Sequence, residues 1–319
     1  MSEAKVSCIY LIDEFEWNDY IPWQVSFNSA LAIADEVVVV KGNRPHTCKG
    51  ESIAGFLKKL SDPKIKVIDY TWPQNFSWFD IAHALNAGLL NCRYEWCFRL
   101  LMDEIIPFGK FRELKKILKN SASYDILRVG RCYQLGDRHL YPYIQKELFF
   151  RNNSQYAYGR VAPSKRQPLL FDNPVKLTER TDFFKLTVAS YRKKFPSYPP
   201  LGERDYNDVK TKNLTLFIIN TDVNYLPDPI LIKQKRQSTG GYFNLPAEYK
   251  GLYRKDIKDA SIIDDHRTKI KKMLKSNKKI KYYKMPPELL DFTKQFSAEH
   301  NSVQRLIKNL HNRGGKTSG

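Results

Sequence analysis

Two adjacent carboxylates, Asp103 and Glu104, directly follow an apolar run at residues 96–102. Carboxylate oxygens are the ligands that Mg²⁺ and Mn²⁺ prefer, and such a cation shares its remaining positions with phosphate and water. The pair is therefore a candidate site for a metal-bound diphosphate. Acidic residues also cap helices, and residues 111–118 have helical spacing, so a capping role is the alternative.

The elements that must position this pair alternate through the first half of the chain. Apolar and β-branched runs predict strands at 5–12, 37–40, 64–70 and 96–102. Helical spacing is found at 21–34, 52–62 and 79–92. This order predicts an α/β fold with a Rossmann-type, mostly parallel central sheet flanked by helices. Such sheets bind ligands beyond the carboxyl ends of their strands, where Asp103, Glu104, Asp13 and Glu14 all fall.

Composition limits the class of protein. The 319 residues are 42% hydrophobic and 13% aromatic, which is enough for a folded core. Lys and Arg number 53 against 34 Asp and Glu, a net charge of +19, and most of the excess follows residue 231. This balance favours nucleic acid, an anionic membrane or a phosphorylated substrate as partner, and a solvated lysine-rich surface is the equal alternative. The five cysteines form no C-x-x-C pair, so core thiols are expected.

The sequence also bears on location. No apolar run approaches the roughly 20 residues that span a membrane, and the first residues lack the pattern of a secretory signal. We therefore expect a cytoplasmic protein. The basic C-terminal helices either lie on an anionic membrane or pack on the first domain. Nucleic acid is disfavoured as a partner because no helix-turn-helix, zinc, RNP or KH signature is visible.

Five blocks stand in a fixed order along the chain: ADEVVVVKGN at 34–43, ALNAGL at 84–89, EWCFRLLMDE at 95–104, KELFFRNNSQYAYGRV at 146–161 and INTDVNYLPDPILIKQKRQ at 219–237. In this order they resemble the motifs of family 2 glycosyltransferases of the GT-A fold, in a variant subgroup that lacks the first Asp of the D-x-D metal motif. The resemblance implies a GT-A-like domain at residues 1–237. A basic, mainly helical extension would then occupy residues 238–319.

The resemblance further implies transfer of a sugar from a nucleotide-sugar donor to a glycan, lipid-linked or protein acceptor. Mn²⁺ or Mg²⁺ would bind the diphosphate through Asp103, supported by Glu104 and Asp222. Donor-binding roles would fall to Asp13, Glu14, Lys41, Asn86 and Met102. In the stretch GERDYND, Glu203 and Asp205 are the candidates for a catalytic base.

This chain departs from the family pattern at four ligand-facing positions, which are Lys41, Leu85, Leu101 and Asn220. Leu101 stands where the first Asp of D-x-D would be, which weakens the expected metal site. The alternative is a catalytically inactive GT-A-like protein, or a polyanion-binding protein that acts through its basic C-terminal region. His46 and His83 have no nearby ligand partner in sequence, so surface or helix-face roles are expected. Residues 151–160 are expected to form part of a β-hairpin.

Overall fold

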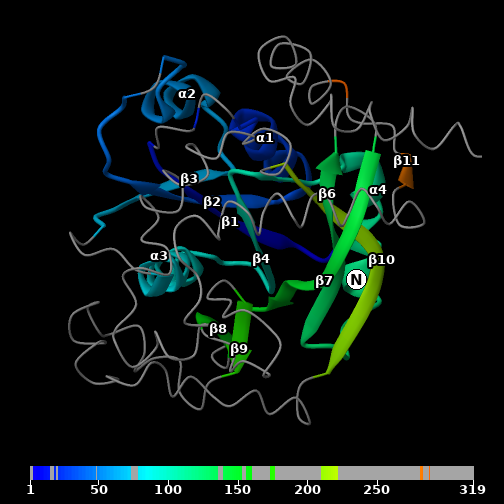
Figure 1. Ribbon diagram of the computed structural model, residues 1–319. Helices are drawn as coiled ribbons and strands as arrows, with labels where there is room; N and C mark the ends of the chain where they lie inside the picture. Colours follow the sequence, from blue (N-terminus) through cyan, green and yellow to red (C-terminus); the bar gives the residue numbers. More distant parts are fainter. Residues whose placement is uncertain are drawn as a thin grey trace, which may run out of the picture.

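The computed structural model describes residues 3–14, 18, 21–47, 49–72, 78–135, 139–152, 156–159, 173–176, 210–221, 281–282 and 287. Within these residues a nine-stranded mixed sheet forms the centre of the molecule, and helices lie on both of its faces (Figure 1). No helix in the described part of the chain is long and apolar enough to cross a membrane.

The first half of the chain alternates strands and helices, as the sequence predicts. These elements are β1 (Val6–Ile12), α1 (Trp23–Ile33), β2 (Glu36–Gly42), α2 (Ile53–Leu60), β3 (Ile65–Tyr70), α3 (Trp78–Leu90) and β4 (Trp96–Leu101). The strands lie in the order β3-β2-β1-β4, and every pairing among them is parallel. Helices α1 and α2 lie on one face and α3 on the other (Figure 1). The predicted α/β fold class is confirmed.

The remaining described elements extend this sheet. They are β5 (Glu104–Ile105), α4 (Phe108–Phe111), α5 (Leu114–Lys119), β6 (Ile126–Leu135), β7 (His139–Arg151), β8 (Tyr156–Gly159), β9 (Asn173–Lys176), β10 (Thr211–Asn220) and β11 (Lys281–Tyr282). Strand β7 lies between β4 and β6 and is antiparallel to both. Strand β10 is parallel to β6 and antiparallel to β5. Strand β11 pairs with β7, while β8 and β9 form a separate two-stranded sheet.

Of residues 151–160 the structure describes 151–152 and 156–159, and the latter form β8, which pairs antiparallel with β9. The structure differs from the sequence prediction in two local features. The helix expected at 111–118 is divided into α4 and α5, because Glu113 leaves helical geometry at φ −96° and ψ 10°. Neither Asp103 nor Glu104 caps these helices, since α4 follows Pro107 and no side chain caps the start of α4 or α5.

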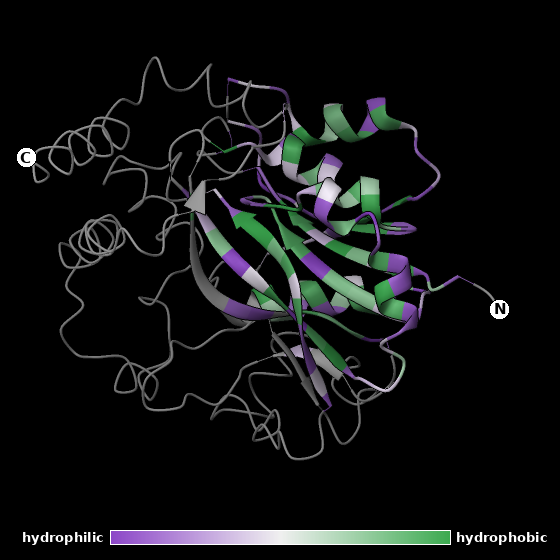
Figure 2. Cartoon of the chain, turned by 90° about the vertical axis from the view of Figure 1, so that its right-hand side faces the viewer, coloured by the Kyte–Doolittle hydropathy of each residue, from purple (hydrophilic) through white to green (hydrophobic). Residues whose placement is uncertain are grey.

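Three of the parallel strands, β1, β2 and β4, are buried on both faces, whereas β3 at the end of the sheet is mostly exposed or half-buried. The four valines at 37–40 are each 0% exposed, as expected for a strand between two helical layers. On α3, Gly88 permits close packing, because a Cβ there would lie 2.5 Å from Cγ2 of Ile9 on β1. Figure 2 shows mainly hydrophobic residues along the central strands, whereas the helices carry both hydrophobic and hydrophilic residues. The described cysteines are free thiols, three of them buried and the last half-buried: Cys8, Cys97, Cys132 and Cys92.

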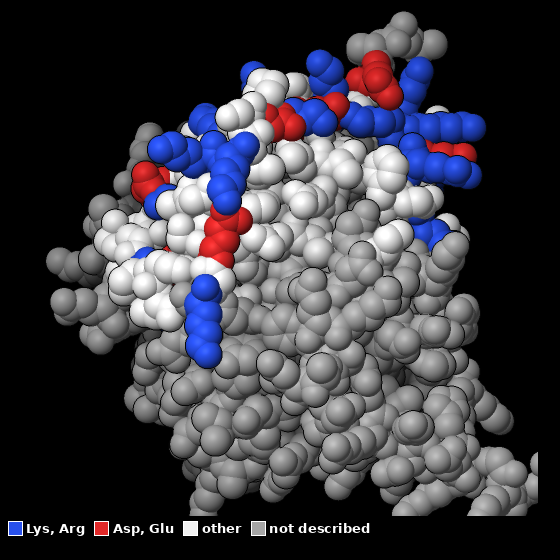
Figure 3. Space-filling model, turned by 90° about the horizontal axis from the view of Figure 1, so that it is seen from above, with Lys and Arg blue, Asp and Glu red and all other residues white. Residues whose placement is uncertain are grey.

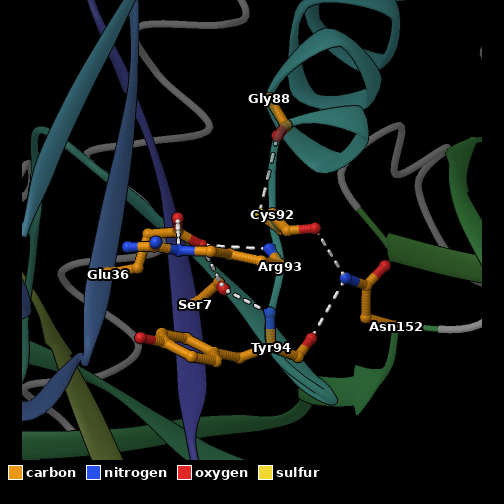
Figure 4. Close-up of polar contacts among 7 residues, drawn as sticks. All are labelled: Ser7, Glu36, Gly88, Cys92, Arg93, Tyr94 and Asn152. Carbon is orange, nitrogen blue, oxygen red and sulfur yellow. Dashed lines mark hydrogen bonds and ion pairs between the residues drawn. The ribbon is translucent and has the colours of Figure 1, made fainter.

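A polar network closes the amino-terminal edge of the parallel strands (Figure 4). Glu36, at the start of β2, accepts a hydrogen bond from the Ser7 hydroxyl at 2.7 Å and pairs with Arg93 Nε at 2.7 Å. Ser7 Oγ in turn accepts from the amide of Tyr94 at 3.3 Å. The side-chain amide of Asn152 donates to the Tyr94 carbonyl at 3.0 Å. These contacts fix the turn before β4 and give this edge a stabilising role.

Candidate functional site

The parallel register aligns the carboxyl ends of four strands at one edge of the sheet. Ile12 of β1 lies opposite Lys41 of β2, and Lys41 lies opposite Asp69 of β3. On the other side of β1, Leu11 lies opposite Leu101 of β4. The segments that follow the four strands therefore meet at this edge. Their polar and aromatic residues include Asp13, Glu14, Arg44, Trp72 and Asp103.

Asp13 is a buried carboxylate at this edge, with a side chain that is 1% exposed. Its Oδ1 accepts hydrogen bonds from the main-chain amides of Glu14 at 2.8 Å and Arg44 at 3.1 Å. Its Oδ2 lies 3.0 Å from Nε of Arg44. Burial raises the pKa of Asp13, although the bonds from Arg44 and Glu14 act in the opposite direction. A Cβ on Gly42 would lie 2.1 Å from Cγ of Asp13, so only glycine lets the two strand ends approach this closely.

Aromatic side chains line the same edge after β3. The rings of Tyr70 and Trp72 meet edge to face with centroids 4.8 Å apart. The Tyr70 hydroxyl lies 2.8 Å from Nδ1 of His83 on α3, and the Trp72 amide donates to Oδ1 of Asn43 at 3.2 Å. A carboxylate, a guanidinium and aromatic rings at one strand edge form a set that suits a flat heterocyclic base and its ribose.

Sequence reasoning missed Arg44, Tyr70 and Trp72. Their positions in the sequence could have indicated them, since Arg44 follows the turn at Gly42 and Trp72 is two residues beyond the end of β3. His83 was expected to be an isolated histidine, and its partner Tyr70 lies 13 residues away on a different element. A spacing rule for metal ligands cannot find a contact of this kind.

Glu14 joins two neighbouring segments to the end of β1. Its Oε2 lies 2.9 Å from Nδ1 of His46, and its Oε1 accepts the main-chain amide of Ile53 at 2.7 Å. Ile53 is the first residue of α2, where Ser52 caps the helix by accepting from Gly55 at 3.1 Å. Glu14 therefore holds α2 and the loop before it against the edge. Its role in donor binding stays a prediction.

Three further residues predicted to bind the donor make contacts with other parts of the protein. Lys41 Nζ pairs with Oδ1 of Asp69 at 2.7 Å across neighbouring strands. Asn86 is 1% exposed, and its amide both donates to the Tyr158 carbonyl at 2.8 Å and accepts from the Tyr158 amide at 2.7 Å. Met102 is 6% exposed and packs in the main hydrophobic core. Asn86 thus fastens β8 to α3, and Met102 anchors the turn before Asp103.

The turn that carries Asp103 is held from two sides. The Ser26 hydroxyl of α1 lies 2.9 Å from the Leu101 carbonyl oxygen and 2.5 Å from that of Glu104. Directly after β10, Thr221 donates to the Asp103 carbonyl from its amide at 2.8 Å and from its hydroxyl at 3.0 Å. The main chain on both sides of Asp103 is therefore fixed by residues distant in sequence.

Glu104 is 0% exposed and faces three cations. It pairs with Arg99, and its Oε1 lies 3.4 Å from Arg131 Nη2 and 3.5 Å from Lys146 Nζ. These contacts make Glu104 a support beneath the Asp103 turn. Among the residues that the structure describes, no group of three or more His, Cys, Asp or Glu side chains could hold a metal ion. A divalent cation at Asp103 would take its other ligands from the diphosphate, water or residues outside the described ranges.

Three predicted residues, Glu203, Asp205 and Asp222, lie outside the described residues, as does most of the predicted extension at 238–319. Asp222 directly follows Thr221, whose bonds to the Asp103 carbonyl place the end of β10 beside the Asp103 turn. Glu203 and Asp205 stay predictions from the resemblance.

Comparison with known proteins gives distant structural similarity. No protein-family model and no curated protein matches the chain. A crystal structure titled S. aureus TarS 1-349 has a TM-score of 0.40 at 13% identity, covering 97% of this chain and 92% of that one. A putative glucose-1-phosphate thymidylyltransferase from Bacillus anthracis, in complex with a sucrose, has a TM-score of 0.35 at 11% identity, covering 79% and 96%. A second S. aureus TarS structure has a TM-score of 0.37 at 11% identity, covering 94% of this chain and 55% of that one. At these values the similarity identifies neither a family nor a function, so the function rests on the geometry of the sheet edge.

Proposed function

We propose that the protein is a glycosyltransferase of the GT-A type that transfers a sugar from a nucleotide-sugar donor to a glycan, lipid-linked or protein acceptor. The observation that carries this proposal is the convergence of Asp13, Arg44, Trp72 and Asp103 at the carboxyl edge of four parallel strands. Ligands of open α/β sheets bind at such an edge.

The donor has two ends, and the edge offers a suitable surface for each. Trp72 and Tyr70 provide aromatic faces for the base, while Asp13 and Arg44 provide an acceptor and donors of hydrogen bonds for the base or ribose. On the neighbouring strand end, Asp103 would bind Mn²⁺ or Mg²⁺ together with the diphosphate. The cation would stabilise the negative charge of the leaving group.

The other predicted residues take supporting parts in this proposal. Glu104 holds the Asp103 turn through its cationic partners, and Asp222 is proposed as a further metal ligand. Lys41, already paired with Asp69, is proposed to meet a donor phosphate. Glu203 or Asp205 is proposed as the base that deprotonates the acceptor, which requires a carboxylate within hydrogen-bond reach of the attacking hydroxyl.

A thermal-shift panel tests the donor site. UDP-, GDP-, CMP- and dTDP-sugars are added with and without Mn²⁺ to wild type, Asp103→Asn and Asp13→Asn. A ligand that binds only the folded state adds about 2.7 kcal/mol of stability at 100 times its Kd. We expect one nucleotide class to raise the Tm only with Mn²⁺, and both variants to lose this rise.

Asp125→Asn is the matched control, because Asp125 precedes β6 and accepts the amide of Lys210 at 3.0 Å, away from the carboxyl edge. It should keep the full donor response. If no nucleotide sugar changes the Tm of the folded wild type, the proposal is wrong. The inactive or polyanion-binding protein then becomes the favoured function.

A further inference from the structure

The segment formed by α4 and α5 packs one side on the core and leaves another side exposed. Phe111, Leu114 and Leu118 are each at most 2% exposed and fill the buried side. The main-chain amide of Ile117 donates to the Glu113 carbonyl at 3.0 Å and closes the first turn of α5, while Arg112 and Glu113 form the turn that separates α4 from α5.

Four exposed residues of this segment form two pairs with helical spacing. Phe108 and its neighbour Arg112, at the C-cap of α4, are four residues apart, and Lys116 and Lys119 on α5 are three apart, so each pair lies on one face of its helix. Phe108 is a large apolar side chain left 53% exposed. Glu113 is the only acidic residue between positions 108 and 119; it is exposed at the turn between Arg112 and α5, and the cationic residues of the segment outnumber it. We name these four residues the α4–α5 stripe.

Some other basic residues of the described surface pair with acidic neighbours. Lys115 pairs with Asp35, and Lys59 pairs with Glu51. Figure 3 shows the end of the molecule seen from above, where Lys and Arg lie in groups with Asp and Glu between them. The stripe differs from such mixed regions because it combines three cationic residues with an exposed aromatic ring.

We propose that the α4–α5 stripe docks the protein on the surface of an anionic lipid bilayer. The chemistry of the stripe matches both layers of such a surface. Its cations meet lipid phosphates and carboxylates, and the Phe108 ring enters the boundary between headgroups and acyl chains. Nucleic acid would supply phosphates for these cations. It has no apolar layer that the exposed Phe108 ring could enter.

Flotation of the full-length protein with vesicles tests this docking. One vesicle is pure phosphatidylcholine, and the other carries about 30% phosphatidylglycerol, which gives it a negatively charged surface. We expect binding to the anionic vesicles alone. The triple variant R112Q/K116Q/K119Q should bind about 100-fold more weakly, from about fivefold, or about 1 kcal/mol, per cationic residue. Phe108→Ser should bind the anionic vesicles about fivefold more weakly. The loss is limited because about half of the ring is already buried in the protein.

Matched controls separate the stripe from net charge and from the basic C-terminal region. K58Q/K64Q/K66Q removes the same number of exposed positive charges around α2 and β3. Leu90→Ser removes a side chain that is 55% exposed at the end of α3. Both controls should bind like wild type.

Each outcome decides the inference. Equal losses in the K58Q/K64Q/K66Q and stripe variants would mean a general charge effect and would overturn it. Binding that survives in R112Q/K116Q/K119Q would assign any membrane contact to another region. If Phe108→Ser binds vesicles normally and the stripe variants lose only heparin retention, the surface is a site for soluble polyanions. The donor-induced rise in Tm should be unchanged in all these variants, so a failure here is distinguishable from a failure of the proposed function.

Discussion

The carbonyl oxygen of Asp103 accepts two hydrogen bonds from Thr221, at 2.8 Å from the amide and 3.0 Å from the hydroxyl. The two residues are 118 positions apart in the chain. This contact joins the end of β10 to the turn after β4, and it limits the movement of the proposed metal ligand.

Thr221→Val removes the hydroxyl bond but keeps the amide bond and the side-chain shape. We expect a loss of about 1 kcal/mol in the free energy of unfolding, the usual net value of one buried hydrogen bond plus part of the cost of an unsatisfied carbonyl. Because the turn gains freedom, Mn²⁺-dependent donor binding should also weaken. Urea unfolding and donor titration measure the two effects. Thr215→Val, at an exposed position of the same strand, should change neither.

Glu104→Gln should be far more destabilising than Asp103→Asn. Removing the negative charge that faces Arg99, Arg131 and Lys146 leaves buried cations poorly compensated, which costs about 3–5 kcal/mol. Asp103→Asn keeps the main-chain bonds of the turn and should lose donor binding with a smaller loss of stability. Chemical unfolding of both variants gives the comparison. Equal losses of stability in the two variants would contradict the assignment of Glu104 as the support of the turn and of Asp103 as the metal ligand.

Asp13→Asn should change how stability depends on pH. Burial raises the pKa of Asp13 above its ordinary value of 3.8, so the folded state holds this proton more tightly than the unfolded state does. Ionisation of Asp13 therefore costs stability, and the cost grows as the pH rises above about 4 until the folded pKa is passed. The free energy of unfolding of the variant, relative to wild type, should rise over this range. If the free energies of unfolding of the variant and wild type differ by the same amount at every pH from 4 to 7, the pKa of Asp13 is not raised.

Gly42→Ala should damage the carboxyl edge, because its Cβ would lie 2.1 Å from Cγ of Asp13. We expect a loss of about 1–3 kcal/mol, the usual cost of overpacking. Displacement of Asp13 should also reduce donor binding in the thermal-shift assay. Gly109→Ala is the control, since a Cβ there meets nothing within 4 Å, and in helix α4 it should be neutral or stabilise by about 0.5–1 kcal/mol. Similar effects at both glycines would show that close approach to Asp13 is unimportant.

The sequence by itself determined the elements of the first half and the position of the candidate site along them. Strand β2 was predictable because four consecutive valines suit a strand buried on both faces. Asp13 and Asp103 were predictable as edge residues because each directly follows an apolar run, and parallel strands bring their carboxyl ends to one side. These inferences need only local periodicity and the geometry of crossovers.

The tertiary structure alone decided which residues touch at that edge. The pairing of Asn86 with Tyr158, of Ser26 with the Asp103 turn and of Arg44 with Asp13 joins residues that local patterns treat separately. The insertion of β7 between β4 and β6 likewise depends on long-range pairing. Hydrogen bonds and ion pairs of this kind form only after packing has brought distant segments together and excluded water. Local sequence can therefore mark the edge of the sheet, whereas the packed chain selects the partners of each side chain there.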